Sequence, residues 1–160
     1  KNVSDRMKRN FIYLGYTFNL YELLWKFDMK LRSQRHIDSL WMLRSGVSLL
    51  NKEYKKQYWE KIKEYFKEEN ESSSHYFSIG KYLTGQISLD DLSPLMKTIN
   101  QKCELLFYIG LKMESEGKMK QASYYYRACV DTGLKKNIEY DWSNSKLNKW
   151  ARDKKFLSDR

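Results

Sequence analysis

The sequence is poor in the residues that interrupt helices. It contains one proline and seven glycines among 160 residues, so few positions remove a backbone donor or favour a turn. Hydrophobic residues make up 41% of the chain and aromatic residues 16%, which argues against a disordered chain. The length is enough for one domain with a buried core. We therefore predict an all-α fold.

Cysteine and histidine are also scarce, with two of each. Two cysteines are too few for a disulfide framework or a cysteine-based zinc site. The chain also lacks the glycine-rich phosphate loop and the motifs H-E-x-x-H, C-x-x-C and G-x-S-x-G. We expect no enzyme activity, no catalytic residues, no cofactor and no metal site.

Long apolar runs are missing as well. No stretch reaches the roughly 18 consecutive apolar residues of a membrane-spanning helix. The chain begins at Lys1 rather than methionine, which suggests processing. The lack of a signal peptide or lipidation cysteine at this start therefore says nothing about export. The cellular compartment stays open.

Acidic residues are outnumbered by basic ones, 20 against 30, which gives a net charge of +10. This excess favours acidic partners such as nucleic acid, anionic lipid or an acidic protein surface. The alternative, which we prefer, is that lysines on exposed helix faces keep the chain soluble. Between residues 52 and 69 glutamates are mixed with the lysines and aromatics, and ion pairs along one helix explain that pattern.

What the chain does contain is a segment, 103–136, with the residue spacing of a tetratricopeptide (TPR) helical hairpin. Six positions match that spacing: Leu106, Ile109, Gly110, Met113, Ala122 and Tyr126. Gly110 and Ala122 are small, so the two helices can approach closely there. Gly117 is expected at the turn. The pattern predicts two antiparallel helices that pack as one unit.

The same hairpin carries both cysteines. Cys103 opens the first predicted helix and Cys129 closes the second, so antiparallel packing would bring them close together. Two interpretations stay open. They form a disulfide, or they are free thiols, because Cys129 occupies a small-residue position where a buried thiol packs well.

Residues comparable to Gly110 recur along the chain at intervals of 30 to 34 residues: Gly15, Gly46, Gly80 and Asn144. Such a period is typical of a solenoid built from helical hairpins. We predict a TPR-like helical-hairpin array of about four hairpins. A capping helix at about 137–150 closes it, and residues 1–160 form a single domain.

Local signals indicate where some of these helices begin. Asn51 and Ser88 are good N-cap residues, and Asp90 and Asp91 place negative charge in the first turn after Ser88. Pro94 lies further in than the usual first helical position, so we expect that helix to start late or to bend.

The order of these features resembles the carboxyl-terminal half of the bacterial TPR lipoproteins of the NlpI family. The resemblance covers about residues 39–147. Its strongest parts are Leu40, Trp41, Gly85, Ile87, Ser88, Phe107, Tyr108, Gly110, Gly117, Ala122, Asn137 and Glu139. It implies an all-helical, often dimeric protein that is attached to the outer membrane and faces the periplasm. It also implies a non-catalytic adaptor for peptidoglycan hydrolases or a processing protease.

The leading functional hypothesis is a protein-binding adaptor, because the first helices of such hairpins line a concave face. In the best hairpin those positions are Glu104, Phe107, Leu111 and Glu114, and in the closing helix they are Ile138, Asp141, Ser145 and Asn148. This mixed apolar and acidic character suits a peptide or helix with apolar anchors and basic residues. The alternative is a basic helical module that binds nucleic acid or an anionic surface.

Overall fold

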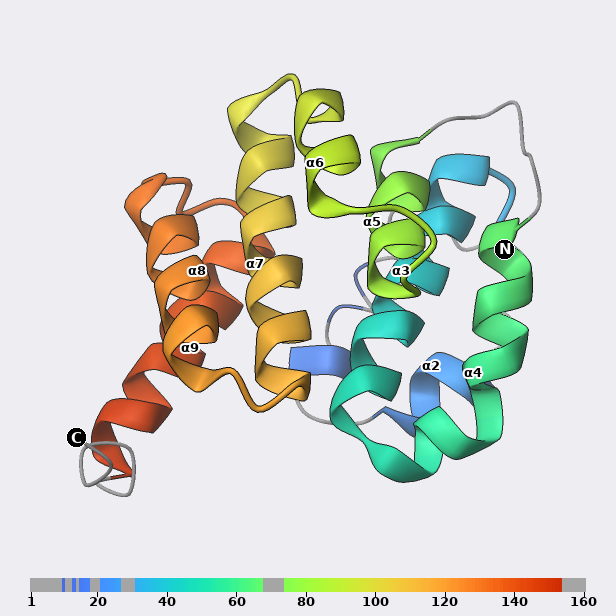
Figure 1. The fold of residues 1–160 in the computed structure, drawn as a ribbon, viewed down its shortest axis with the longest axis horizontal. Coiled ribbons are helices and arrows are strands. Elements are labelled where there is room, and N and C mark those ends of the chain that lie inside the picture. Colours follow the sequence, from blue (N-terminus) through green and yellow to red (C-terminus); the bar gives the residue numbers. More distant parts are fainter. Residues whose placement is uncertain are drawn as a thin grey trace. The chain divides into compact units, whose positions relative to one another are not determined.

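Over the residues that the structure describes, the chain consists of helices joined by turns and short loops, and no strand occurs among them. The structure is a computed structural model that describes residues 10, 13, 15–17, 21–26, 31–67 and 74–153. Its elements are α2 Glu22–Lys26, α3 Gln34–Leu50, α4 Lys52–Lys67, α5 His75–Leu83, α6 Leu89–Leu92, the 3-10 turn η1 Ser93–Leu95, α7 Ile99–Ser115, α8 Met119–Asp131 and α9 Ile138–Arg152 (Figure 1). The prediction of an all-α fold is confirmed.

The chain divides into two compact units, with the boundary between Leu95 and Met96. The first contains α2 to η1 and the second contains α7, α8 and α9. Part of the predicted first hairpin lies outside the described residues. Its described part is helical at residues 13 and 15–17 and in α2. The regular array of about four hairpins and the single domain spanning 1–160 stay predictions.

The predicted second hairpin is present as α3 and α4, which pack against each other. Asn51 separates them, and its side-chain oxygen accepts hydrogen bonds from the backbone N–H groups of Glu53 and Tyr54 at 2.9 and 3.2 Å. This confirms Asn51 as the N-cap of α4. The inner side of α4 buries Ile62 and Phe66, and ion pairs such as Lys63 with Glu60 at 2.7 Å lie on its outer side.

A buried carboxylate ties α3, α4 and α5 together. Asp38 of α3 has no exposed surface and accepts hydrogen bonds from Tyr65 of α4 at 2.6 Å and from Gln34 at 2.9 Å. Ser74 also donates to this carboxylate, while its oxygen caps the backbone of α5 at Phe77. Three neutral donors therefore compensate the burial of one acidic group.

The predicted third hairpin departs from a regular repeat because its second helix is only four residues long. Ser88 does cap α6, in a capping box with Asp91. The helix then ends at Leu92, and Pro94 lies in the 3-10 turn. Gly80 accordingly packs against the previous helix, α4: a Cβ at Gly80 would lie 2.0 Å from the ring of Phe66.

Within the described part of the chain, no helix combines the length and apolar character needed to cross a membrane.

Candidate partner-binding face

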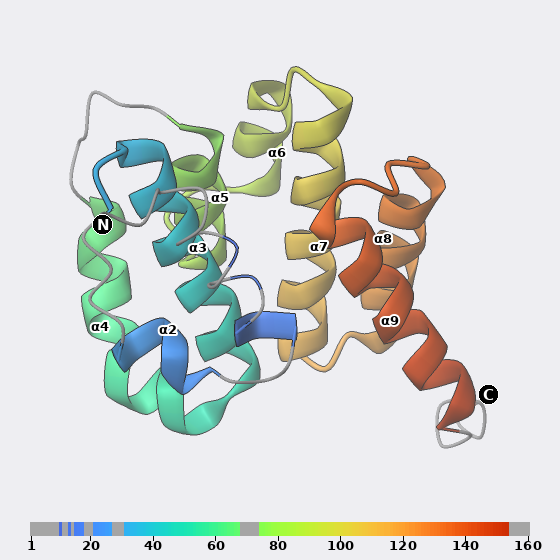
Figure 2. The same cartoon turned by 180° about the vertical axis from the view of Figure 1, so that it is seen from behind.

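The second unit begins with the predicted best hairpin. α7 starts in a capping box, in which Thr98 accepts from the backbone of Gln101 and Gln101 accepts from that of Thr98. Gly117 lies in the turn to α8 with φ of +73°, a conformation that a residue with a Cβ rarely adopts. The two helices run alongside each other in both views (Figures 1 and 2). The helix hairpin and its turn at Gly117 are confirmed.

Close approach between α7 and α8 occurs at Gly110. A Cβ placed there would lie 2.7 Å from the ring of Tyr126 on α8, and such a distance is too short for two carbon atoms. Ala122 is fully buried as well. The small residue at position 110 therefore makes room for a tyrosine ring, and the aromatic residue predicted at position 126 fills that space.

Helix α9 packs against both α7 and α8 and completes a three-helix core. Its centre is aromatic: the ring of Phe107 lies 5.7 Å from that of Tyr126 and 5.4 Å from that of Trp142. Tyr126 in turn lies 5.5 Å from Trp150. The predicted capping helix at about 137–150 is present as α9, and its tryptophans explain why it stays on the hairpin.

Two of the eight positions predicted to line the concave face belong to the core. Phe107 and Leu111 have no exposed surface, so a partner cannot reach them without unfolding part of the protein. This corrects the prediction that Phe107 and Leu111 line a binding groove. The physical reason for Phe107 is the aromatic core, since Tyr126 and Trp142 cover its ring.

Glu114 joins all three helices of the second unit. Its carboxylate accepts hydrogen bonds from Lys146 of α9 at 2.9 and 2.7 Å, one to each oxygen, and from the hydroxyl of Tyr126 of α8 at 2.7 Å. The two charged side chains are only about a fifth exposed. Glu114 is therefore held in place by α8 and α9, and its charge is neutralised by Lys146.

The remaining predicted residues are more accessible. Glu104 on α7 is half-buried, and Asp141 and Asn148 on α9 are exposed. Asp141, Ser145 and Asn148 follow one another at steps of four and three residues, so they share one side of α9, and Ser145 is exposed too. Ile138 at the start of α9 is half-buried. We call Asp141, Ser145 and Asn148 the α9 face.

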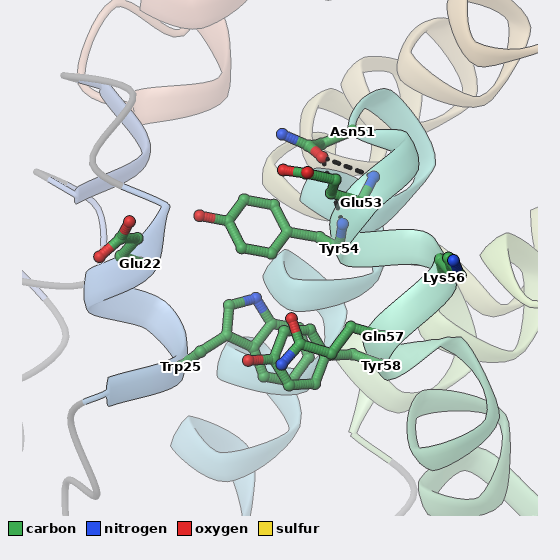
Figure 3. Close-up of a pocket in the computed structure, with 8 residues that line it drawn as sticks. All are labelled: Glu22, Trp25, Asn51, Glu53, Tyr54, Lys56, Gln57 and Tyr58. Carbon is green, nitrogen blue, oxygen red and sulfur yellow. Dashed lines mark hydrogen bonds between the residues drawn. The ribbon is translucent and has the colours of Figure 1, made fainter.

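A cavity of about 750 Å³ lies in the first unit, lined from α2 and the beginning of α4 (Figure 3). Trp25 stacks on Tyr58 inside it, with ring centroids 3.8 Å apart, and Arg44 covers the Trp25 ring at 4.8 Å. Glu22 and Glu53 add carboxylates to the lining. Sequence reasoning missed this cavity, because nothing in the sequence pairs Tyr54 or Tyr58 of α4 with Trp25 of α2.

The residues that the structure describes contain no group of three or more histidine, cysteine, aspartate or glutamate side chains placed to hold a metal ion. In the second unit, the carboxylate of Glu114 accepts a hydrogen bond from Lys146, and that of Asp141 lies on the surface.

Comparison of the chain with known protein families, with curated proteins and with solved structures finds no match in any of the three.

Proposed function

We propose that this chain is a non-catalytic adaptor that binds a partner protein or peptide through a TPR-like face of its second unit. The observation that supports this most directly is the contact between α7 and α9 through Glu114 and Lys146. In TPR-like arrays the first helix of each hairpin lies next to the first helix of the following one. The contact between α7 and α9, with α8 between them in sequence, supports the proposal of such an arrangement.

The binding surface is polar, because Phe107 and Leu111 are buried. It consists of the α9 face together with Glu104 on α7, while Glu114 holds the two helices together. Asp141 and Glu104 give it acidic character, which suits basic side chains of a partner. Asn148 and Ser145 add groups that donate and accept hydrogen bonds. The partner is therefore a basic or amide-rich segment.

Site-specific crosslinking tests this proposal even while the partner is unidentified. A photoreactive amino acid placed at Asn148 lies on the α9 face, and one placed at Gln121 lies on an exposed position of α8. We expect crosslinked partner from position 148 and much less from position 121. Equal crosslinking at both positions, or none at 148, contradicts the assignment of the binding surface.

A second candidate function is binding of single-stranded nucleic acid by the outer side of α8. Lys120, Tyr124 and Arg127 recur there at steps of four and three residues, and all three are exposed. Tyr124 is 68% exposed, the largest value among the exposed large hydrophobic side chains that the structure describes. Cations that neutralise phosphates beside an aromatic ring that stacks on a base are the elements of such sites.

Fluorescence anisotropy with a labelled single-stranded RNA distinguishes this candidate. Binding should weaken steeply with added salt and should fall further in the Lys120→Glu, Arg127→Glu double variant. A matched Lys135→Glu, Lys136→Glu double variant, which changes the same charge in the loop after α8, should bind RNA more tightly than the α8 variant. RNA binding that is the same in both variants excludes the α8 surface.

A further inference from the structure

The two cysteines meet where the beginning of α7 lies against the end of α8. Their sulfur atoms are 3.2 Å apart, and both side chains are fully buried in their free form. Each thiol also points at the backbone of the other residue: the Cys129 sulfur lies 3.2 Å from the carbonyl oxygen of Cys103, and the Cys103 sulfur lies 3.8 Å from that of Cys129. The antiparallel hairpin therefore holds the pair in register.

Closing a bond between these atoms requires little movement. A disulfide has a sulfur–sulfur distance of about 2.05 Å, so the two sulfurs must approach by roughly 1 Å. Rotation of the side chains can supply part of this. The pair differs from isolated buried cysteines, which act only as small apolar residues.

We propose that Cys103 and Cys129 are the site of a reversible internal disulfide that forms on reaction with a hydroperoxide. The thiolate of Cys103 attacks one oxygen of hydrogen peroxide, the O–O bond breaks, and hydroxide leaves, so that Cys103 becomes a sulfenic acid. The sulfur of Cys129 then attacks the Cys103 sulfur, the S–O bond breaks, and a second hydroxide leaves. The two thiol protons combine with the two hydroxides. Two thiols and one peroxide give one disulfide and two waters.

The electrostatics of the pair assign these roles. The hydrogen bond from Cys129 lowers the pKa of Cys103 to about 7, so Cys103 is the thiol that ionises first. The pKa of Cys129 is raised, chiefly by the neighbouring Cys103 and also by burial. Cys129 therefore keeps its proton until the second step. Because both thiols are buried, peroxide reaches them only when the hairpin end opens locally, and the reaction is slower than that of an exposed thiol.

The disulfide would link α7 to α8 across 26 positions of sequence. A crosslink of this length restricts the unfolded chain and so favours the folded hairpin. This hairpin is also the base on which α9 packs. The disulfide would act on the stability of the second unit, whether or not that unit binds the proposed partner.

Intact mass measurement on the full chain tests the proposal. The reduced protein is treated with hydrogen peroxide, the excess is removed with catalase, and free thiols are alkylated in denaturant. We expect a monomer that takes up no alkylating agent and weighs about 2 Da less than the reduced chain. Reductant should restore both thiols. The melting temperature of the oxidised chain should be higher than that of the reduced chain by about 5 °C or more.

Single-cysteine variants are the matched controls. Cys103→Ala and Cys129→Ala each retain one thiol in the same buried place, and peroxide should leave that thiol free, oxidise it to a sulfur acid or produce dimers. Intact mass of the wild-type chain decides the question even where a variant folds poorly. Two alkylated thiols after peroxide treatment, accumulation of sulfinic acid on the wild-type monomer, or disulfides only between chains would each overturn the proposal.

Discussion

Lys146 and Glu114 form an ion pair in which the ammonium nitrogen contacts both carboxylate oxygens, at 2.9 and 2.7 Å. The pair joins α9 to α7, and the Tyr126 hydroxyl brings in α8 at 2.7 Å. Partial burial makes such a group costly to leave without its counter-charge. The polar network and the aromatic core therefore both hold α9 against α7 and α8.

Replacing Lys146 by methionine should lower the free energy of unfolding of the second unit by about 1–3 kcal/mol, because Glu114 then keeps only the Tyr126 hydrogen bond. Urea denaturation together with hydrogen exchange in α7, α8 and α9 measures this. Lys149→Met, on an exposed position of the same helix, should cost less than about 0.5 kcal/mol. The Glu114→Leu, Lys146→Met double variant should lose less than the sum of its single changes, and an additive loss contradicts the pairing.

Gly110→Ala should destabilise the hairpin although alanine is the better helix former. The added methyl group would lie 2.7 Å from the Tyr126 ring, and Glu114 fixes that ring through its hydroxyl. Overpacking costs about 1–3 kcal/mol, against a gain of about 1 kcal/mol in helix propensity. We expect a net loss near 1 kcal/mol in thermal or urea unfolding. Ser145→Ala, at an exposed helical position, is the control and should be neutral or stabilising.

Charge reversal on the α9 face should weaken partner binding. Asp141→Lys replaces the exposed carboxylate that the proposal places against a basic partner, and we expect the affinity for the partner recovered by crosslinking to fall about tenfold, or about 1.4 kcal/mol. Asp131→Lys makes the same change in net charge at an exposed position of α8 and should preserve binding. Titration calorimetry with both variants measures the difference. Equal losses would indicate that only overall charge matters.

The reactivity of Cys103 should depend on Cys129. Alkylation requires the thiolate, so in the wild-type chain its rate should rise with pH around a midpoint near 7, the lowered pKa of Cys103. In Cys129→Ala the hydrogen bond that lowers this pKa is lost, while burial and the charge of Glu104 still raise it. The midpoint should therefore move upward by more than one pH unit. Mass spectrometry of the alkylated Cys103 peptide follows both rates, and an unchanged midpoint contradicts the coupling.

Much of the fold could be predicted from local signals. The caps at Asn51 and Ser88 set helix starts because their oxygens satisfy nearby backbone N–H groups, and no distant contact is needed for that. The α7–α8 hairpin could be predicted because Gly110 and Ala122 are small and Gly117 favours a turn. The brevity of α6 was harder to predict, because Asp90 and Asp91 favour a helix that Pro94 then ends within a few residues.

The candidate site was less accessible to sequence reasoning. The position of a residue in the TPR spacing shows on which side of its helix the residue lies. It does not show whether that side faces solvent or another helix. Phe107 was predicted to face a groove, but Trp142 of α9 covers it, and nothing in the spacing of α7 alone indicates how α9 lies. The stacking of Trp25 on Tyr58 escaped prediction for the same reason, because it joins helices that are separated in sequence.

The cap of α7 is made entirely by its own neighbourhood: Gln101 accepts from the backbone N–H groups of Lys97 and Thr98, and Thr98 accepts from that of Gln101. Truncation of the chain just before Lys97 would therefore take away none of the hydrogen bonds that start this helix. A recombinant fragment of residues 97–160 carries its own nucleation signal, which makes it a natural starting point for isotope labelling and solution spectroscopy.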